Sequence, residues 1–99
     1  MANWVKADIK NQLDLVCMLK EVRKYYRYRA TDEEQYIFRK IEVDYFHEVK
    51  ILLIIAEEWA KSYRKAHIDN LEKYYDLMNE EPNNAICLQV IGYVKTLIS

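Results

Sequence analysis

Apolar residues recur every three or four positions along most of the chain, which is the spacing of helices that each bury one face. A first run extends from Asn3, a suitable N-terminal cap, to about Tyr28. The helix that it predicts carries an apolar face made of Val5, Ile9, Leu13, Val16, Leu19, Val22 and Tyr26.

The second run, from Thr31 to about Ala66, contains the most apolar block of the chain, Val49 to Ala56. Thr31 and Glu34 fit a capping box, so the helix should begin there. The block is too short to cross a bilayer, which requires roughly 20 apolar residues. It therefore predicts the buried waist of a long helix, whose main stripe is Ile37, Phe38, Ile41, Tyr45, Val49, Leu52, Leu53, Ala56, Trp59, Ala60 and Tyr63.

Around this waist the helix is apolar on nearly every side, which is typical of burial on more than one side. A continuous helix from 31 to 66 would measure about 54 Å, whereas a compact domain of this size has a radius of gyration of about 13 Å. Either the helix breaks or a second copy covers its overhang. Because no glycine or proline interrupts the run, we predict a homodimer packed around Ile51, Ile54, Ile55 and Trp59.

Two further helices are predicted beyond the long one. The apolar phase shifts around residues 66–70, where Asp69 or Asn70 could cap a short helix with Leu71, Tyr74, Tyr75 and Met78 inward. A break at residues 80–84 contains the only proline. From Ala85 to Ile98 many residues are β-branched, but the polar positions fall three or four apart, so this segment should be a helix central to the core.

Composition narrows the functional classes. The chain has 99 residues with 15 basic and 16 acidic side chains, so its net charge of −1 creates no global attraction to nucleic acid or anionic membranes. The N-terminal residues lack the apolar core of a signal peptide, and we expect an intracellular protein. Cys17 and Cys87 are too few for a disulfide framework or a zinc site and should be buried thiols, although a disulfide between them stays open.

The strongest chemical signal is a basic strip on the first predicted helix, interleaved with tyrosines. Its cations could follow the phosphates of a nucleic acid while the tyrosines stack on bases. The simpler interpretation is that cations near a helix C-terminus complement the helix dipole, with Asp32, Glu33 and Glu34 as partners. The basic strip consists of Lys20, Arg23, Lys24 and Arg27.

Catalytic and metal chemistry are poorly represented. Asp44, His47 and Glu48 resemble half of a carboxylate-histidine site of a helix bundle, but further ligands at matching spacing are missing. Hydroxyl and thiol side chains have no neighbouring base, and Gly92 is the only glycine, so no phosphate-binding loop can form. We therefore expect no enzymatic activity, metal or other cofactor.

Two segments and the overall composition suggest a source. Little Gly, Pro, Ser and Thr with much Tyr, Ile, Lys and Glu resembles proteins of hyperthermophilic archaea and their viruses. Residues 1–6 (Met-Ala-Asn-Trp-Val-Lys) and 23–29 (Arg-Lys-Tyr-Tyr-Arg-Tyr-Arg) resemble a small helical protein of an Acidianus filamentous virus, with relatives in filamentous and rod-shaped viruses of crenarchaea. The resemblance implies an all-helical viral protein in an archaeal host cell, without assigning residues to a function.

Together these patterns predict one all-α domain of about four helices over residues 1–99, with short loops and one core layer around the last helix. The predicted function is a non-enzymatic protein-protein interaction or structural accessory role, with a second copy and a viral or host protein as partners and no membrane. The alternative is nucleic-acid binding through the basic strip.

Overall fold

The computed structural model describes residues 4–99 and folds them into four α-helices without strands. Helix α1 spans Lys6–Tyr26, α2 spans Asp32–Tyr63, α3 spans Ile68–Glu80 and α4 spans Asn84–Ile98. A short 3-10 helix, η1, covers Lys65–His67 between α2 and α3. The all-α prediction with one long helix is confirmed.

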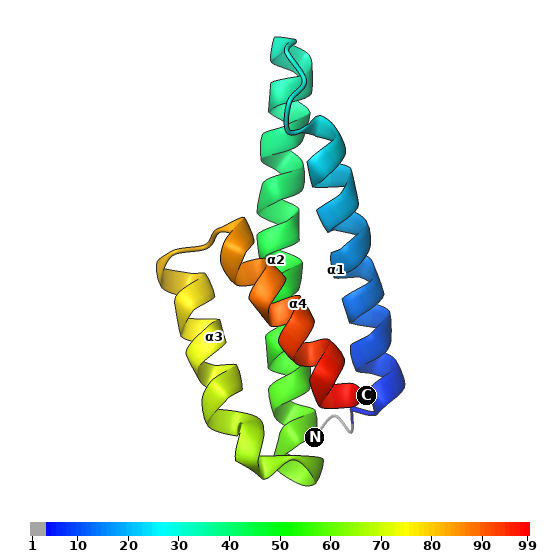
Figure 1. Ribbon diagram of the computed structural model, residues 1–99, viewed down its shortest axis with the longest axis vertical. Helices are drawn as coiled ribbons and strands as arrows, with labels where there is room; N and C mark the ends of the chain where they lie inside the picture. The colour runs from blue at the N-terminus through cyan, green and yellow to red at the C-terminus, as the bar shows by residue number, and fades with distance from the viewer. Residues whose placement is uncertain (1–3) are drawn as a thin grey trace.

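Helices α1 and α2 form an antiparallel hairpin along the long axis of the molecule, and α3 and α4 pack against its lower part (Figure 1). The molecule measures 47 × 26 × 24 Å. The closed end of the hairpin, around residues 27–31 that join α1 to α2, extends beyond α3 and α4, and we call it the arm (Figure 1). The overhang expected from the length of the second helix therefore exists in the single chain.

The start of α2 follows the predicted cap. The Thr31 hydroxyl accepts a hydrogen bond from the Glu34 backbone N–H at 3.1 Å, and it donates to the Glu34 carboxylate at 2.8 Å. Glu34 thus reaches back to the side chain of the cap residue, where the usual capping box uses the backbone N–H. Both contacts fix the first turn of α2.

Other boundaries differ by a few residues from the prediction. Helix α1 begins at Lys6, where the Asp8 carboxylate accepts from the Val5 N–H at 2.9 Å, and it ends at Tyr26 rather than Tyr28. The predicted cap Asn3 lies outside the described residues. Helix α2 ends at Tyr63 rather than Ala66, because Arg64 leaves helical geometry with φ −148° and ψ 60°.

The predicted cap at Asp69 or Asn70 is wrong. Helix α3 begins at Ile68 and follows directly on η1, so its preceding residue His67 already has helical dihedrals and no extended cap residue is needed. The predicted inward face of α3 is correct, since Leu71 and Met78 are buried and Tyr74 and Tyr75 pack against the core.

Helix α4 begins where the proline and asparagines predicted a break, with Asn83 accepting from the Ile86 N–H at 3.0 Å. It contacts each of the other three helices. This confirms its central place in the core, to which it contributes Cys87, Val90, Ile91, Val94 and Leu97.

The waist of α2 is covered by helices of the same chain. Leu52, Leu53, Ile55 and Ala56 all belong to the single hydrophobic core. Every buried side chain among residues 4–99 is apolar or, for Tyr45 and Trp59, largely so. Over the same residues, no helix combines the length and the hydropathy needed to span a membrane.

Candidate functional site

The inward stripe of α1 changes its chemistry part of the way along the helix. In the lower part it consists of Ile9, Leu13 and Val16, which are buried in the core. Continuing in the same direction at helical spacing, the stripe becomes the basic strip. The change occurs near the start of α4, because the cations share a cleft with Asn84, the first residue of that helix.

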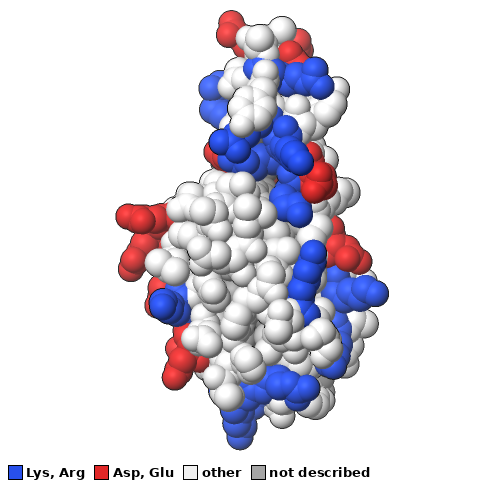
Figure 2. All heavy atoms as spheres, viewed as in Figure 1, with Lys and Arg blue, Asp and Glu red and all other residues white. Residues whose placement is uncertain are grey.

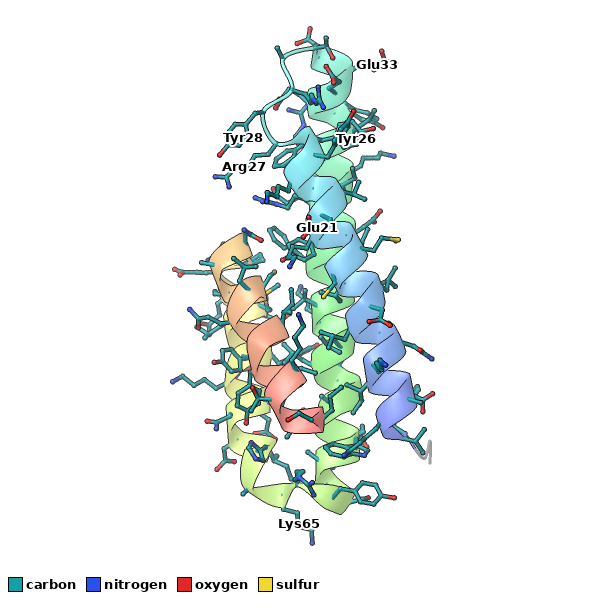
Figure 3. The ribbon with its side chains drawn as sticks, turned by 45° about the vertical axis from the view of Figure 1, so that its right-hand side comes forward. Glu21, Tyr26, Arg27, Tyr28, Glu33 and Lys65 are labelled. Carbon is teal, nitrogen blue, oxygen red and sulfur yellow. The ribbon has the colours of Figure 1, made fainter. Side chains whose placement is uncertain are left out.

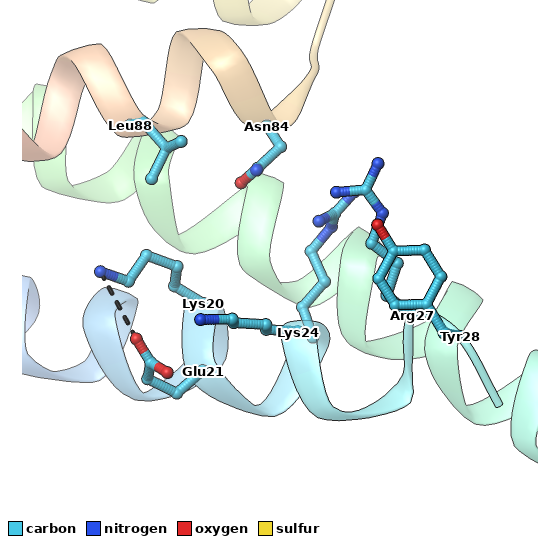
Figure 4. A pocket seen from close by; sticks show the side chains of 8 residues that line it. Lys20, Glu21, Lys24, Arg27, Tyr28, Asn84 and Leu88 are labelled. Carbon is cyan, nitrogen blue, oxygen red and sulfur yellow. Dashed lines mark ion pairs between the residues drawn. The ribbon is translucent and has the colours of Figure 1, made fainter.

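The whole basic strip lines one cleft between α1 and the beginning of α4. Its volume is about 330 Å³, and Glu21, Tyr28, Asn84 and Leu88 complete the lining. Lys20 and Lys24 run along α1 on the side that faces Asn84 and Leu88 of α4, while Arg27 and Tyr28 stand at one end (Figure 4). The strip predicted from the sequence is thus a recessed site and not a flat helix face.

Figure 2 shows the same arrangement on the surface. Lys and Arg side chains gather at the lower part of the arm, directly above a mostly uncharged area over α4. In a second view, Arg27 and Tyr28 project from the arm on the side where α4 begins (Figure 3). Tyr28 is 83% exposed, which leaves its ring free at the mouth of the cleft.

Arg23 plays a different part from the other three cations. Its Nε and Nη2 donate to the same oxygen of Glu42, at 3.0 and 2.9 Å, and its guanidinium lies 5.1 Å from the centre of the Phe38 ring. Only 11% of the Arg23 side chain is exposed. Arg23 therefore ties α1 to α2, and its charge is largely compensated.

The remaining cations are more available. Lys20 is 3.6 Å from Glu21, a loose surface pair that contributes little. No carboxylate of residues 4–99 lies within ion-pair distance of Lys24 or Arg27. The prediction that Asp32, Glu33 and Glu34 pair with the cations of the basic strip is wrong. Among residues 4–99, the only cation within ion-pair distance of these carboxylates is Arg29, at 3.9 Å from Glu34.

The wall that α4 contributes was not foreseen. The Tyr45 hydroxyl donates to Asn84 Oδ1 at 3.0 Å, and this leaves the Asn84 amide NH₂ as a donor beside the lysines. The positive end of the α4 dipole lies at the same place. Sequence spacing alone contains no signal for this wall, because it depends on where α4 crosses α1.

A second surface feature lies on the face of α2 that points away from the core. Tyr36, Val43 and Ile54 occupy one line along the helix and are 54%, 67% and 46% exposed. We call these three residues the outer row. Beside it lies a shallow groove lined by Tyr36, Arg39, Lys40, Val43 and Asp44. Their common spacing was the available signal, but Lys40, His47 and Lys50 lie between them along the same line of the helix and interrupt the apolar pattern.

The structure separates the four residues predicted for a dimer interface. Ile54 is exposed and Ile51 is half-buried, whereas Ile55 and Trp59 belong to the core of the single chain. Ile55 and Trp59 face the interior because they fall on the inward side of α2, next to Leu52 and Ala56. A second copy could meet Ile54 without any rearrangement, but not Ile55 or Trp59.

Other candidate groups do not assemble into a site. Residues 4–99 contain no cluster of three or more His, Cys, Asp or Glu side chains that could hold a metal ion. Cys17 and Cys87 are free thiols. Burial raises the pKa of the Cys87 thiol to about 11, which makes it a poor nucleophile.

Comparisons with known proteins supply no further information about this site. The chain matches no family model, no curated protein and no solved structure. The resemblance to the small proteins of archaeal filamentous viruses therefore stays a prediction.

Proposed function

We propose that this protein is a non-enzymatic interaction protein that associates with a second copy of itself through α2. The observation that carries the proposal is the outer row, in which Tyr36, Val43 and Ile54 leave large apolar side chains exposed along one side of the longest helix. Aligned apolar side chains on an unpaired helix face are typical of helix-helix association.

The charges beside the outer row favour a second copy as the partner. Towards the start of α2 they are basic, at Arg39 and Lys40, and towards its end they are acidic, at Glu57 and Glu58. In an antiparallel pair, each step forward along one helix matches one step back along the other. An arrangement that sets Val43 against Ile54 of the second copy consequently sets Lys40 against Glu57 and Arg39 against Glu58.

The surroundings of Glu57 support this pairing. Burial and the neighbouring Glu72 carboxyl both raise the pKa of Glu57, so within one chain this carboxylate stands beside a group of its own charge. A lysine from a second copy would relieve the repulsion. Glu58 is already paired with Lys61 of its own chain at 2.9 Å, and His47 would face Lys50, which offers no pair of opposite charges. The electrostatic attraction between the two copies therefore comes mainly from Lys40 and Glu57.

Sedimentation velocity over a range of concentrations tests the proposal. Wild-type protein should form a dimer, and Val43→Asp or Ile54→Asp should give folded monomers, because both side chains are outside the core. Met18→Asp is the matched control, since Met18 is also 54% exposed but lies on the outer face of α1. A wild-type monomer at the highest concentration reached, or a Met18→Asp variant that dissociates equally, would overturn the proposal.

A charge exchange tests the antiparallel register. Arg39→Glu with Lys40→Glu should weaken the dimer, and adding Glu57→Lys with Glu58→Lys should restore it, since opposite charges then meet again. If Glu57→Lys with Glu58→Lys does not restore association, the antiparallel register is wrong. The outer row would still be the interface as long as Val43→Asp disrupts the dimer.

A further inference from the structure

We propose that the cleft between α1 and the start of α4 binds the sugar-phosphate backbone of a single-stranded nucleic acid. This site is separate from the outer row, which lies on another helix and on the face of α2 that points away from the core. The proposal therefore does not depend on self-association.

The first step is the electrostatics of the cleft. Lys20, Lys24 and Arg27 line it together, while Glu42 is occupied by Arg23 and only Glu21 contributes an opposing charge. The protein as a whole has a net charge of −1, so this excess of positive charge is local to the cleft. Such a local excess favours the binding of an anion there. Lysine and arginine donors in such a recess suit phosphate oxygens.

The second step is the polar wall opposite these cations. Asn84 is held by its bond from Tyr45, so its NH₂ group is a positioned donor rather than a mobile one. It stands in the first turn of α4, where the helix dipole also favours a negative charge. A phosphate in the cleft would thus meet donors from both α1 and α4.

The third step is the shape of the site, which distinguishes a single strand from a duplex. Proteins that read a duplex insert a convex helix or ribbon into a groove. Here α4 closes one side of the cleft, so that Lys20 has only 29% of its side chain exposed, while Lys24 and Arg27 stand exposed along its edge. A single strand can enter this recess, whereas the rigid cylinder of a duplex meets only its rim.

Tyr28 supplies the contact that a single strand requires in addition to charge. Its ring is almost fully exposed at the mouth of the cleft, and the Arg27 guanidinium lies 5.3 Å from the ring centre. An unpaired base can stack on an exposed aromatic ring next to a phosphate-binding cation, and such stacking tolerates any base. We therefore expect binding with little sequence preference.

The test is fluorescence anisotropy with a labelled single-stranded DNA of roughly ten nucleotides at low salt. Lys24→Glu combined with Arg27→Glu should weaken binding roughly tenfold or more. Both residues are exposed, so the variant should fold. Lys6→Glu combined with Lys10→Glu is the matched control, because it also exchanges two cations for two carboxylates, at exposed positions of α1 that do not line the cleft.

Salt dependence and one gain-of-binding variant sharpen the result. With three phosphates neutralised, the logarithm of affinity should fall with the logarithm of salt at a slope of about −2. Glu42→Gln should increase the affinity, because it releases the Arg23 charge. Tyr28→Ala should weaken binding roughly tenfold without changing the slope.

Four outcomes would overturn the proposal: no binding at low salt, equal loss in the Lys6→Glu, Lys10→Glu control, unchanged binding in the Lys24→Glu, Arg27→Glu variant, or equal affinity for a duplex of the same length. Val43→Asp, which should disrupt self-association, should bind the oligonucleotide with wild-type affinity per chain. Failure of one proposal can thus be distinguished from failure of the other.

Discussion

The Tyr45 hydroxyl donates a hydrogen bond to Asn84 Oδ1 over 3.0 Å and joins the middle of α2 to the first residue of α4. Tyr45 is fully buried, so its hydroxyl needs a partner within the protein. Asn84 is in turn held at the cleft by this bond. The two residues connect the core to the candidate nucleic-acid site.

We predict that Tyr45→Phe lowers the free energy of unfolding by about 1 kcal/mol, the usual net value of such a bond. Urea denaturation should measure the loss. Asn84→Ala should cost a similar amount, and the double variant should cost little more than either single one, because the two groups share one interaction. Fully additive losses would show that the bond does not couple the two helices.

The neighbours Ile54 and Ile55 should respond in opposite ways to the same substitution. Ile55→Asp places a carboxylate in the core and should cost roughly 4 kcal/mol or more, enough to remove cooperative unfolding from a marginal domain. Ile54→Asp is on the outer surface and should cost about 1 kcal/mol or less. Circular dichroism of both variants at low, equal concentration checks this pair.

Equal effects of the two substitutions would contradict the orientation of α2. If both variants unfold, the outer row is buried in the folded state; if neither does, the waist is not part of the core.

This pair also shows what periodicity can and cannot predict. Residues repeating every three or four positions located all four helices, because burying one face of a helix requires that spacing. Within the block from Val49 to Ala56, however, nearly every residue is apolar, so the pattern no longer distinguishes Ile54 from Ile55. Only the packing of three other helices against α2 determines which of them is buried.

The candidate site was predictable to a similar extent. The basic strip could be found from the spacing of its cations on one helix. The pairing of Arg23 with Glu42 and the placement of Asn84 opposite Lys24 depend on how α1 rotates against α2 and where α4 crosses both. Such relationships arise from tertiary packing and have no local signature in the sequence.

A similar limit explains the error at the start of α3. Asp69 and Asn70 are good cap residues, but a 3-10 turn at Lys65–His67 leads into the helix instead. The corner is held from a distance, since His67 and Asn70 both hydrogen-bond the Tyr93 hydroxyl of α4. A contact between segments so far apart in sequence overrides the local capping preference.

The stability of the protein should fall with rising pH because of Cys87. Burial raises the pKa of this thiol from its ordinary 9.0 to about 11 in the folded state. Above pH 9.0 the unfolded chain loses the thiol proton while the folded chain retains it, so the unfolded state gains stability until the pH passes about 11. Two pKa units correspond to about 3 kcal/mol.

Measuring the free energy of unfolding of wild type and Cys87→Ala across this interval cancels the contribution of titrating groups that do not interact with Cys87. The wild-type protein should lose its advantage over Cys87→Ala as the pH rises. A difference between the two proteins that does not change with pH would mean that Cys87 titrates normally. Thiol labelling of the folded protein should also leave Cys87 unmodified and favour Cys17, which is only partly buried.

Replacing the only glycine should stabilise the protein. Gly92 lies in the interior of α4 on its exposed side, and a Cβ atom built there meets no other atom within 4 Å. Among residues 4–99 no glycine has a positive φ, so alanine fits the backbone without strain. Because glycine costs about 1 kcal/mol relative to alanine inside a helix, Gly92→Ala should raise the free energy of unfolding by about that amount.

Gln89→Ala, on the same exposed side of α4, is the control and should change stability by only a few tenths of a kcal/mol. Thermal unfolding of the two variants decides between the outcomes, since a destabilised Gly92→Ala protein would mean that something outside the single chain approaches the helix closely at this position.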